Sequence, residues 1–239
     1  MKKTFTILAA FVALLSGKTQ AAQPQLVYTL TGVNIATAEE HDISSLGLNT
    51  TTGYTLMLTG NWTNRGNGPL LWLSNAAGEA GYSGGSTDGQ LHSTATIGYS
   101  TGANKFAITY GDGGAGGGTH TLPASPVTIP SSTQPASTDV TVTLFLTSQG
   151  GTATIYELAS DGNLYQTSTR SDYATGDVAT LSIGNWAISR GSVQEGTMNA
   201  SIFSGVLTTQ QMADLIPEPT TATLSLLALA GLAARRRRH

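Results

Sequence analysis

The chain has 239 residues, no cysteine, and charged side chains at only 10% of its positions, which excludes disulfide bridges, thiolate metal sites and a cysteine nucleophile. Residues 23–216 hold 4 basic and 13 acidic residues, a net charge of −9. Because Lys and Arg supply most of the affinity for phosphates, this acidic body is expected not to bind nucleic acid. Threonine is the most frequent residue, so hydroxyls rather than ions should contact the solvent.

The first 21 residues have the parts of a secretory signal peptide. Two lysines near the start are followed by an apolar run over residues 5–15 and by small residues before Ala21. This run of 11 residues is shorter than the roughly 20 that a membrane-spanning helix needs. We therefore expect export, cleavage by signal peptidase after Ala21, and a mature domain over residues 22–216.

Two long segments alternate between apolar and polar residues, which is typical of half-buried strands. In YTLMLTGNWT, residues 54–63, the alternation places Trp62 in the core. In DVTVTLFLTS, residues 139–148, valines and leucines share one face and threonines the other, with Phe145 as the exception. Both segments predict strands of a sheet with one apolar face.

The later part of the body predicts a hairpin, two further strands and one helix. In TATIYELASDGNLYQTST, Asp161-Gly162 supplies the turn between two strands. VATLSIGNWA and GTMNASIFSGVL each indicate another strand. Thr208 with Gln211 three residues later forms a capping box, which predicts a short helix. The Pro-, Ser- and Thr-rich residues 121–138 are interpreted as a long surface loop; the alternative is an interdomain linker.

These elements predict an all-β fold, an antiparallel two-sheet β-sandwich of the jelly-roll type with one short C-terminal helix. Their order resembles the laminin-G-like, concanavalin A-like superfamily over about residues 25–216. The resemblance is carried by YTLMLTGNW, GTATIYELASDGNLY and, most specifically, GTMNASIFSGVLTTQQMADL. That superfamily includes lectins, adhesive modules and glycosidases, so the resemblance does not decide the function.

Catalytic motifs are absent from the sequence. The glucanase branch of the laminin-G-like, concanavalin A-like superfamily carries the motif Glu-x-Asp-x-x-Glu on one strand. This motif does not occur in the chain. No Gly-x-Ser-x-Gly motif occurs either. Glu157 is interpreted as a solvated strand residue. We therefore expect a protein that is not an enzyme, with a glycosidase built on Glu157 as the alternative.

Two polar segments are candidates for metal sites. EEHD, residues 39–42, is the densest charge cluster, but four consecutive residues cannot all point at one ion, so a surface loop is expected. YGDGGAGGGTH, residues 110–120, lacks the lysine of a phosphate-binding loop and indicates a loop between strands. The alternative is that Asp112 helps to bind calcium, which the resemblance to laminin-G-like modules implies.

Aromatic residues near turns are candidates for a sugar-stacking surface, since Trp and Tyr combine apolar faces with polar edges. The alternative for each is a packing role in the core or at its rim. The four candidates are Trp72, Tyr82, Tyr99 and Trp186.

The C-terminal residues 217–239 predict a sorting signal. Residues 220–234 would form a helix of about 22 Å, shorter than the ~30 Å hydrocarbon core of a membrane. The arginines after this helix would stay on the cytoplasmic side. The order closely resembles the PEP-CTERM sorting signal of Gram-negative bacteria, with a triplet and an arginine cluster formed by Pro217, Glu218, Pro219, Arg235, Arg236, Arg237 and Arg238.

The sorting-signal resemblance implies an exosortase-like processing enzyme as a partner and a final place in the cell envelope, at the surface or in the extracellular matrix. The alternative is a plain C-terminal membrane anchor that is never processed. Taken together, the sequence predicts an exported, non-catalytic carbohydrate- or polymer-binding module, with glycans or exopolysaccharide as partners. A glycosylated structural coat protein is the alternative.

Overall fold

The computed structural model describes most of the body of the chain, namely residues 23–64, 68–75, 93–100, 105–107, 119–120, 127–130, 139–184 and 195–216. The predicted signal peptide and the sorting tail lie outside these described residues, and both stay predictions. Among the described residues, no helix is long and apolar enough to cross a membrane.

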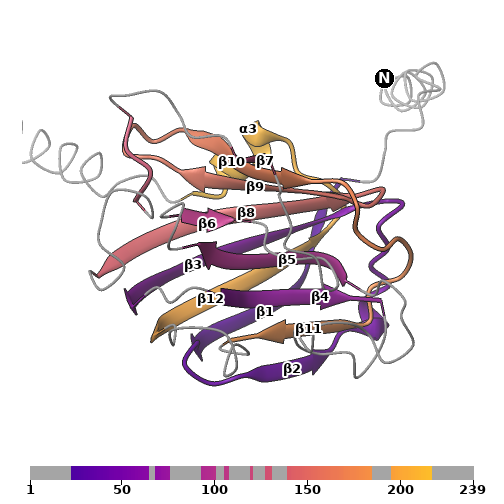
Figure 1. Cartoon of the computed structure of the whole chain (residues 1–239). Coiled ribbons are helices and arrows are strands. Elements are labelled where there is room, and N and C mark those ends of the chain that lie inside the picture. The colour runs from indigo at the N-terminus through magenta and orange to yellow at the C-terminus, as the bar shows by residue number, and fades with distance from the viewer. Residues whose placement is uncertain are drawn as a thin grey trace, which may run out of the picture.

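The strands form two sheets, and every strand pairing is antiparallel (Figure 1). The larger sheet has seven strands in the order β1 (Gln25–Asn34), β12 (Glu195–Ser204), β3 (Tyr54–Asn64), β8 (Val140–Gln149), β9 (Thr152–Leu158), β10 (Leu164–Arg170) and β7 (Thr119–His120). The smaller sheet has five strands in the order β2 (Glu39–Asp42), β11 (Thr180–Ile183), β4 (Gly68–Ser74), β5 (Ser93–Ser100) and β6 (Lys105–Ala107). The predicted two-sheet sandwich is confirmed.

Both sheets combine strands from the two sides of residues 121–138. The smaller sheet places β11 between β2 and β4, and the larger sheet places β12 between β1 and β3. Neither side of that segment therefore completes a sheet alone.

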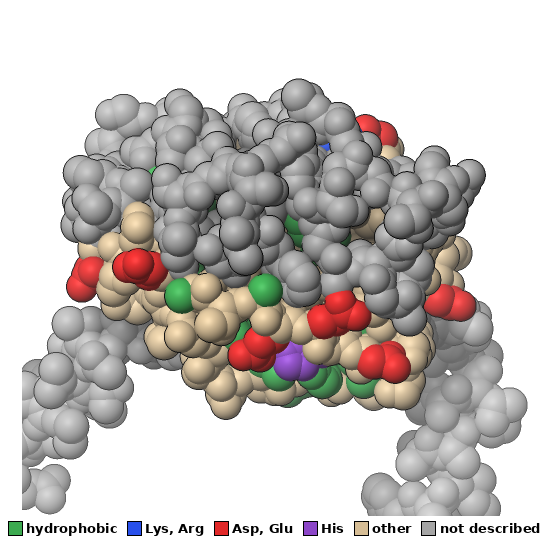
Figure 2. All heavy atoms as spheres, turned by 60° about the horizontal axis from the view of Figure 1, so that its bottom comes forward, with side chains coloured by type: hydrophobic (Ala, Val, Ile, Leu, Met, Phe, Trp, Pro, Cys, Tyr) green, Lys and Arg blue, Asp and Glu red, His purple; other side chains and the backbone are tan. Residues whose placement is uncertain are grey.

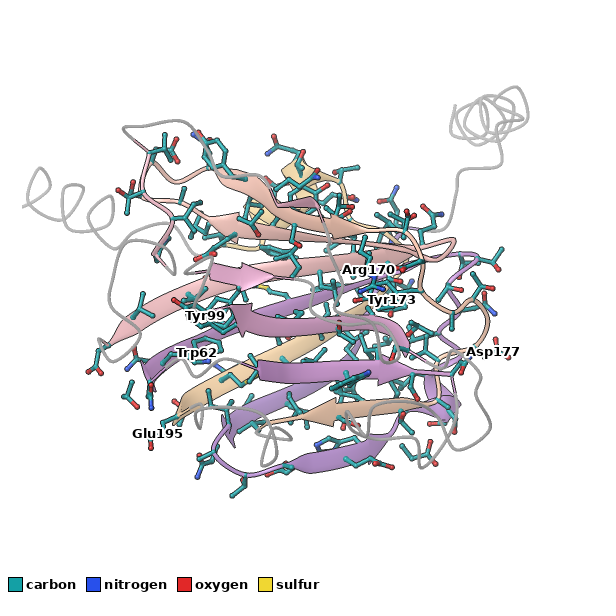
Figure 3. The ribbon with its side chains drawn as sticks, viewed as in Figure 1. Trp62, Tyr99, Arg170, Tyr173, Asp177 and Glu195 are labelled. Atoms are coloured by element: carbon teal, nitrogen blue, oxygen red, sulfur yellow. The ribbon has the colours of Figure 1, made fainter. Side chains whose placement is uncertain are left out.

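The main core lies between the two sheets and follows the predicted alternation. In β3, Leu56, Leu58 and Trp62 are fully buried, and in β8 the two valines and two leucines are buried with them. The Trp62 ring meets Phe106 edge-on at a centroid distance of 5.0 Å, and Tyr99 meets the same ring at 5.3 Å. The side chains of Trp62 and Tyr99 lie near one another inside the sandwich (Figure 3).

Phe145, the exception in the β8 pattern, belongs to a second and smaller cluster on the opposite face of the seven-stranded sheet. The short helix α3 (Thr209–Asp214) covers that face, and its Met212 packs against Phe145, Phe203 and Leu207. The predicted capping box is confirmed: Thr208 Oγ1 accepts a hydrogen bond from Gln211 N at 3.2 Å, and Gln211 Oε1 accepts one from Thr208 N at 2.9 Å.

The predicted hairpin is confirmed, but the interpretation of Glu157 is wrong. β9 and β10 pair across a turn in which Gly162 has a φ of 82°, a backbone conformation that favours glycine. Glu157 is fully buried rather than solvated. It lies directly opposite Leu144 and shares its face with Ile155, because side chains two residues apart in a strand point the same way.

The EEHD segment is also corrected, because it forms the edge strand β2 and not a loop. Its residues pair in register with β11, with Glu40 opposite Ser182 and Asp42 opposite Thr180. The strand is short and strongly charged, as is common for strands at the edge of a sheet. Its four side chains therefore alternate between two faces.

Replacing Leu144 by Ala should lower the free energy of unfolding by about 2–5 kcal/mol, because a fully buried leucine leaves a cavity. Thr141→Ala, on the exposed side of the same strand, is the matched control and should change it by no more than about 0.5 kcal/mol. Urea titrations of both variants measure the difference. Equal effects would contradict the assignment of the two faces of β8.

Thr208→Ala should destabilise the C-terminal end of the body by about 1 kcal/mol, because the backbone N–H of Gln211 loses its capping acceptor. Thr209→Ala, at the first helical position, removes a similar side chain without removing the cap. Hydrogen exchange of the α3 amides should accelerate in the first variant and not in the second. Unchanged exchange in Thr208→Ala would show that the cap does not hold the helix.

Candidate functional site

The predicted sugar-stacking residues do not form an exposed platform among the described residues. Tyr99 is fully buried in the main core, so its ring is not available to a sugar, and that prediction is wrong. Trp72 is 5% exposed, and its Nε1 donates a hydrogen bond to Ser93 Oγ at 2.6 Å. Tyr82, Trp186 and the predicted calcium ligand Asp112 lie outside the described residues.

The structure instead brings together a set of polar side chains on the face of the five-stranded sheet that points away from the core. We call this set the outer polar face. Two rows of side chains make up this face. Each row crosses β2, β11 and β4 through residues that lie directly opposite one another on the paired strands. The rows are Glu40–Ser182–Trp72 and Asp42–Thr180–Ser74.

The alternation in β11 explains why these residues share a face. Leu181 and Ile183 are buried in the main core. Because successive side chains of a strand point to opposite faces, Thr180 and Ser182 must point away from that core. Residues directly opposite each other on paired strands share a face. Thr180 Oγ1 and Ser74 Oγ are 2.9 Å apart and hydrogen-bonded, which locks the second row.

Ser182 is the unusual member of the outer polar face. The residue is 1% exposed, and in the described part of the chain its Oγ has no hydrogen-bond partner. A buried hydroxyl without a partner costs about 1–3 kcal/mol, and native proteins contain few of them. Glu40 lies opposite Ser182 on one side and Trp72 on the other. The hydroxyl therefore lacks a partner at a position flanked by a carboxylate and an indole.

The edge of the outer polar face is acidic. Glu40 and Asp42 are exposed, and Figure 2 shows carboxylates gathered around a histidine where β2 reaches the surface. Asp42 Oδ1 accepts hydrogen bonds from Ser44 Oγ at 2.6 Å and from Ser44 N at 2.9 Å. These two bonds, the hydroxyl first, lower the pKa of the Asp42 carboxyl below its usual value.

His41 lies on the other side of β2 and connects the two sheets. Its Nδ1 is 3.3 Å from the hydroxyl of Tyr28 in β1, and its Nε2 is 3.5 Å from a carboxylate oxygen of Glu39. The Tyr28 and His41 rings also meet edge-on at 6.3 Å. These contacts hold the edge strands of the two sheets together, so His41 is not part of the outer polar face.

Two buried tyrosines form a second polar group near the start of β5. Tyr54 Oη is 3.0 Å from Thr94 Oγ1, and Tyr173 Oη is 2.6 Å from Thr96 Oγ1. Burial raises the pKa of Tyr54 to about 12 and raises the pKa of Tyr173 as well. Phenols held neutral and hydrogen-bonded in this way stabilise the fold and are poor general bases.

Arg170 packs over Tyr173. Its guanidinium carbon lies 5.6 Å from the centre of the Tyr173 ring, and its Nη2 donates to an Asp172 carboxylate oxygen at 2.6 Å (Figure 3). Nε also donates to the other oxygen of Asp172, so the pair is bidentate. The hydrogen bond from Arg170 lowers the pKa of the Asp172 carboxyl. This arrangement fixes the end of β10 against the segment that follows it.

No group of three or more His, Cys, Asp or Glu side chains in the described ranges could hold a metal ion. The alternation of residues 39–42 along β2 explains this result for the acidic cluster, because Glu40 and Asp42 point to one face and Glu39 and His41 to the other.

No protein-family model and no curated protein sequence matches the chain. Several solved β-sandwich structures resemble it. A sialidase of Trypanosoma rangeli matches with a TM-score of 0.43 and 13% identity, and it covers 78% of this chain. The chain spans only 27% of that sialidase. Similarity at this level does not transfer an activity to the chain.

Two further solved structures resemble the chain at similar levels. The exoplasmic/lumenal domain of VIP36, solved in a form bound to Ca²⁺ and Man3GlcNAc, matches with a TM-score of 0.40 and 13% identity over 81% of this chain and 87% of the domain. A GH54 α-L-arabinofuranosidase matches with a TM-score of 0.43 and 12% identity over 80% of this chain and 41% of the enzyme.

The raised pKa values of the buried tyrosines predict a loss of stability at alkaline pH. The unfolded chain releases the Tyr54 proton near its usual pKa of about 10, whereas the folded chain holds it to about 12. The stabilisation is therefore fully present below pH 10 and is lost as the pH rises from about 10 to about 12. Urea titrations across this range should show that loss, with a weaker pH dependence in Tyr54→Phe. Ionisation of Tyr54 below pH 10 in the folded protein, seen by ultraviolet absorbance, would contradict its burial.

Proposed function

We propose that the chain is an exported, non-catalytic module that binds carbohydrate through the outer polar face. The observation that supports this proposal best is the buried hydroxyl of Ser182, which has no partner and lies between Glu40 and Trp72. A ligand hydroxyl placed there would supply the missing hydrogen bond and recover part of its cost.

The side chains of the outer polar face suit a polyol. Sugars present hydroxyls that both donate and accept, and this face offers carboxylate acceptors together with serine and threonine hydroxyls. Binding sites commonly combine an apolar wall with a few well-placed polar groups. Here Trp72, a residue that is 5% exposed, supplies the apolar part.

Carboxyl placement supports binding rather than hydrolysis. Glycosidases need two carboxyl groups flanking the scissile bond, one of them an acid with a raised pKa. On the outer polar face Glu40 and Asp42 come from one edge strand, and the pKa of Asp42 is lowered. The alternative glycosidase built on Glu157 is poorly supported, because Glu157 is fully buried.

The proposed location rests on the ends of the sequence. Residues 1–21 support export, and the Pro-Glu-Pro triplet, apolar run and arginine cluster of residues 217–239 support sorting by an exosortase-type system to the envelope or matrix of a Gram-negative bacterium. Calcium bound through Asp112 is a further part of this proposal, and removal of calcium by a chelator tests it.

A second candidate function, a glycosylated or self-packing structural coat, has its own supporting observation. The outer side of β12, β3 and β8 carries two register rows of uncharged residues, Thr197–Asn61–Thr141 and Asn199–Thr59–Thr143. In the described structure the hydroxyls of Thr141, Thr143 and Thr197 make no hydrogen bond within the protein. Intact mass and oligomeric state of the exported protein test this function, and an unmodified monomer would contradict it.

Ser182→Ala should separate stability from binding. Removing a buried hydroxyl that has no partner should leave the melting temperature unchanged or raise it, whereas binding to a glycan found on an array should weaken roughly threefold to tenfold. The experiment uses the full chain on a broad glycan array, with calcium and again with a chelator.

Ser201→Ala is the matched control for Ser182→Ala, because Ser201 lies on the outer side of the other sheet. It should not alter glycan binding. If no sugar on the array binds, the proposed function is wrong. If both variants bind as the unaltered protein does, the chain binds sugar elsewhere than the outer polar face.

A further inference from the structure

We propose that the α3 end of the body lies against a lipid bilayer while the tail of the same chain is inserted in that bilayer. This inference rests on the membrane insertion that the proposed sorting requires, and it adds a lipid-contacting surface on the folded body. We call it the α3 apolar surface. It consists of two exposed residues, Leu26 and Leu215, and of four half-buried ones, Met57, Tyr156, Leu164 and Ile216.

The exposed large apolar residues of the described chain are two leucines, and both belong to this end of the body. Leu26 is 56% exposed and Leu215 is 38% exposed. One exposed leucine is ordinary, but contiguous apolar surface marks a contact with a protein or a membrane. Leu26 lies opposite Phe203 in the pairing of β1 with β12, so both side chains share the outer face of the seven-stranded sheet. Phe203 in turn packs against Met212 of α3.

Leu215 lies on the side of α3 that faces the start of β1. It keeps helical backbone angles and follows Gln211 by four residues, so the two side chains share one side of the helix. Gln211 Nε2 donates a hydrogen bond at 3.2 Å to Oε1 of Gln23, three residues before Leu26. The two exposed leucines therefore flank the junction between the first strand and the last helix.

Half-buried side chains extend the apolar surface around α3. Phe145, Phe203, Leu207 and Met212 form the buried part of the cluster beneath the helix. The four half-buried members of the α3 apolar surface pack against this cluster and reach the solvent at its rim. A six-residue helix is too short to cover the whole cluster. The exposed leucines thus continue an apolar region and are not isolated.

The surroundings of α3 carry little charge. The helix and the two residues after it contain one charged side chain, Asp214, and β1 contains none. The acidic strand β2 lies at the opposite end of the sandwich from α3 (Figure 1). A body that meets lipid through α3 therefore keeps the carboxylates of residues 39–42 in water, where charged groups are most stable.

The short link between the body and the predicted membrane segment decides in favour of lipid as the partner. Residues 217–219 can span at most about 10–11 Å, because an extended chain advances no more than ~3.6 Å per residue. A helix over residues 220–234 would add about 22 Å. Measured from arginines at the cytoplasmic boundary, Ile216 would then reach about 33 Å across a bilayer with a ~30 Å hydrocarbon core and a full thickness of ~40–45 Å. That reach ends among the outer headgroups, so the end of α3 would lie there.

The test uses the mature chain, residues 22–239, in phosphatidylcholine vesicles that contain nitroxide-labelled lipids. Because the chain has no cysteine, one introduced cysteine carries a single fluorescent label. Leu26→Cys, Leu215→Cys and Ala213→Cys, at an exposed position of α3, place the label at the proposed contact. Asp42→Cys, on the exposed edge of β2, is the matched control. Leu227→Cys, in the middle of residues 220–234, reports insertion of the tail.

We expect the labels at positions 26, 213 and 215 to shift their emission to the blue on addition of vesicles. Nitroxides at headgroup depth should quench these labels and not the label at position 42, whereas nitroxides deep in the acyl chains should quench the label at position 227. Leu26→Ser/Leu215→Ser should lower quenching of the Ala213→Cys label at least about twofold, because buried apolar area drives interfacial binding. Thr29→Ala/Thr31→Ala, at two exposed positions of β1, should not lower it.

Two results would overturn the inference while insertion of the tail stands: no headgroup quenching at positions 26, 213 and 215 where position 227 is quenched, or equal quenching at position 42. Blue-shifted emission at positions 26 and 215 before lipid is added would also overturn it, because the tail or a second copy would then cover the surface. No quenching at position 227 would contradict insertion of the tail, and with it both the proposed sorting and this inference. Sugar binding by the outer polar face is tested separately by the glycan array.

Discussion

The antiparallel register of the five-stranded sheet is the constraint on which the rest of the structure depends. One alternation in β11 places Leu181 and Ile183 in the core and, by the same step, Thr180 and Ser182 on the opposite face. A slip of β11 by one residue would move Leu181 and Ile183 out of the main core and turn Thr180 and Ser182 into it. Core packing therefore also determines which polar groups meet on the outer polar face. Burial of apolar surface, worth about 25 cal/mol per Å², stabilises this register.

The seven-stranded sheet was largely predictable because its long strands have one face in the core. β3 and β8 show clear alternation, and the hairpin turn and the helix cap depend on residues close together in sequence. The prediction for Glu157 is wrong because a carboxylate indicates an exposed side chain, whereas the position of Glu157 two residues from Ile155 places it on the buried face, opposite Leu144 of another strand.

The five-stranded sheet and its polar face were harder to predict because β4 is buried on both sides, although β11 lies within VATLSIGNWA, which was predicted to be a strand. The side chains from Leu70 to Ser74 are all buried, so no alternation between apolar and polar residues marks the strand. The polar partners are also far apart in sequence: Ser74 and Thr180 are separated by 106 residues. A short acidic segment such as residues 39–42 shows no apolar pattern at all, and only pairing with β11 makes it a strand.

The pairing of β1 with β12 determines when the body can fold. Gln25 meets Ser204, 179 residues later, and Gln211 donates to Gln23 across the same junction. Since β12 also separates β1 from β3, a chain growing from its N-terminus holds both strands without their shared partner until residues 195–204 have been synthesised. The ten residues of β1 carry no charge, and such unpaired strands tend to aggregate. Shielding of β1 until β12 is available therefore protects the nascent protein against such aggregation.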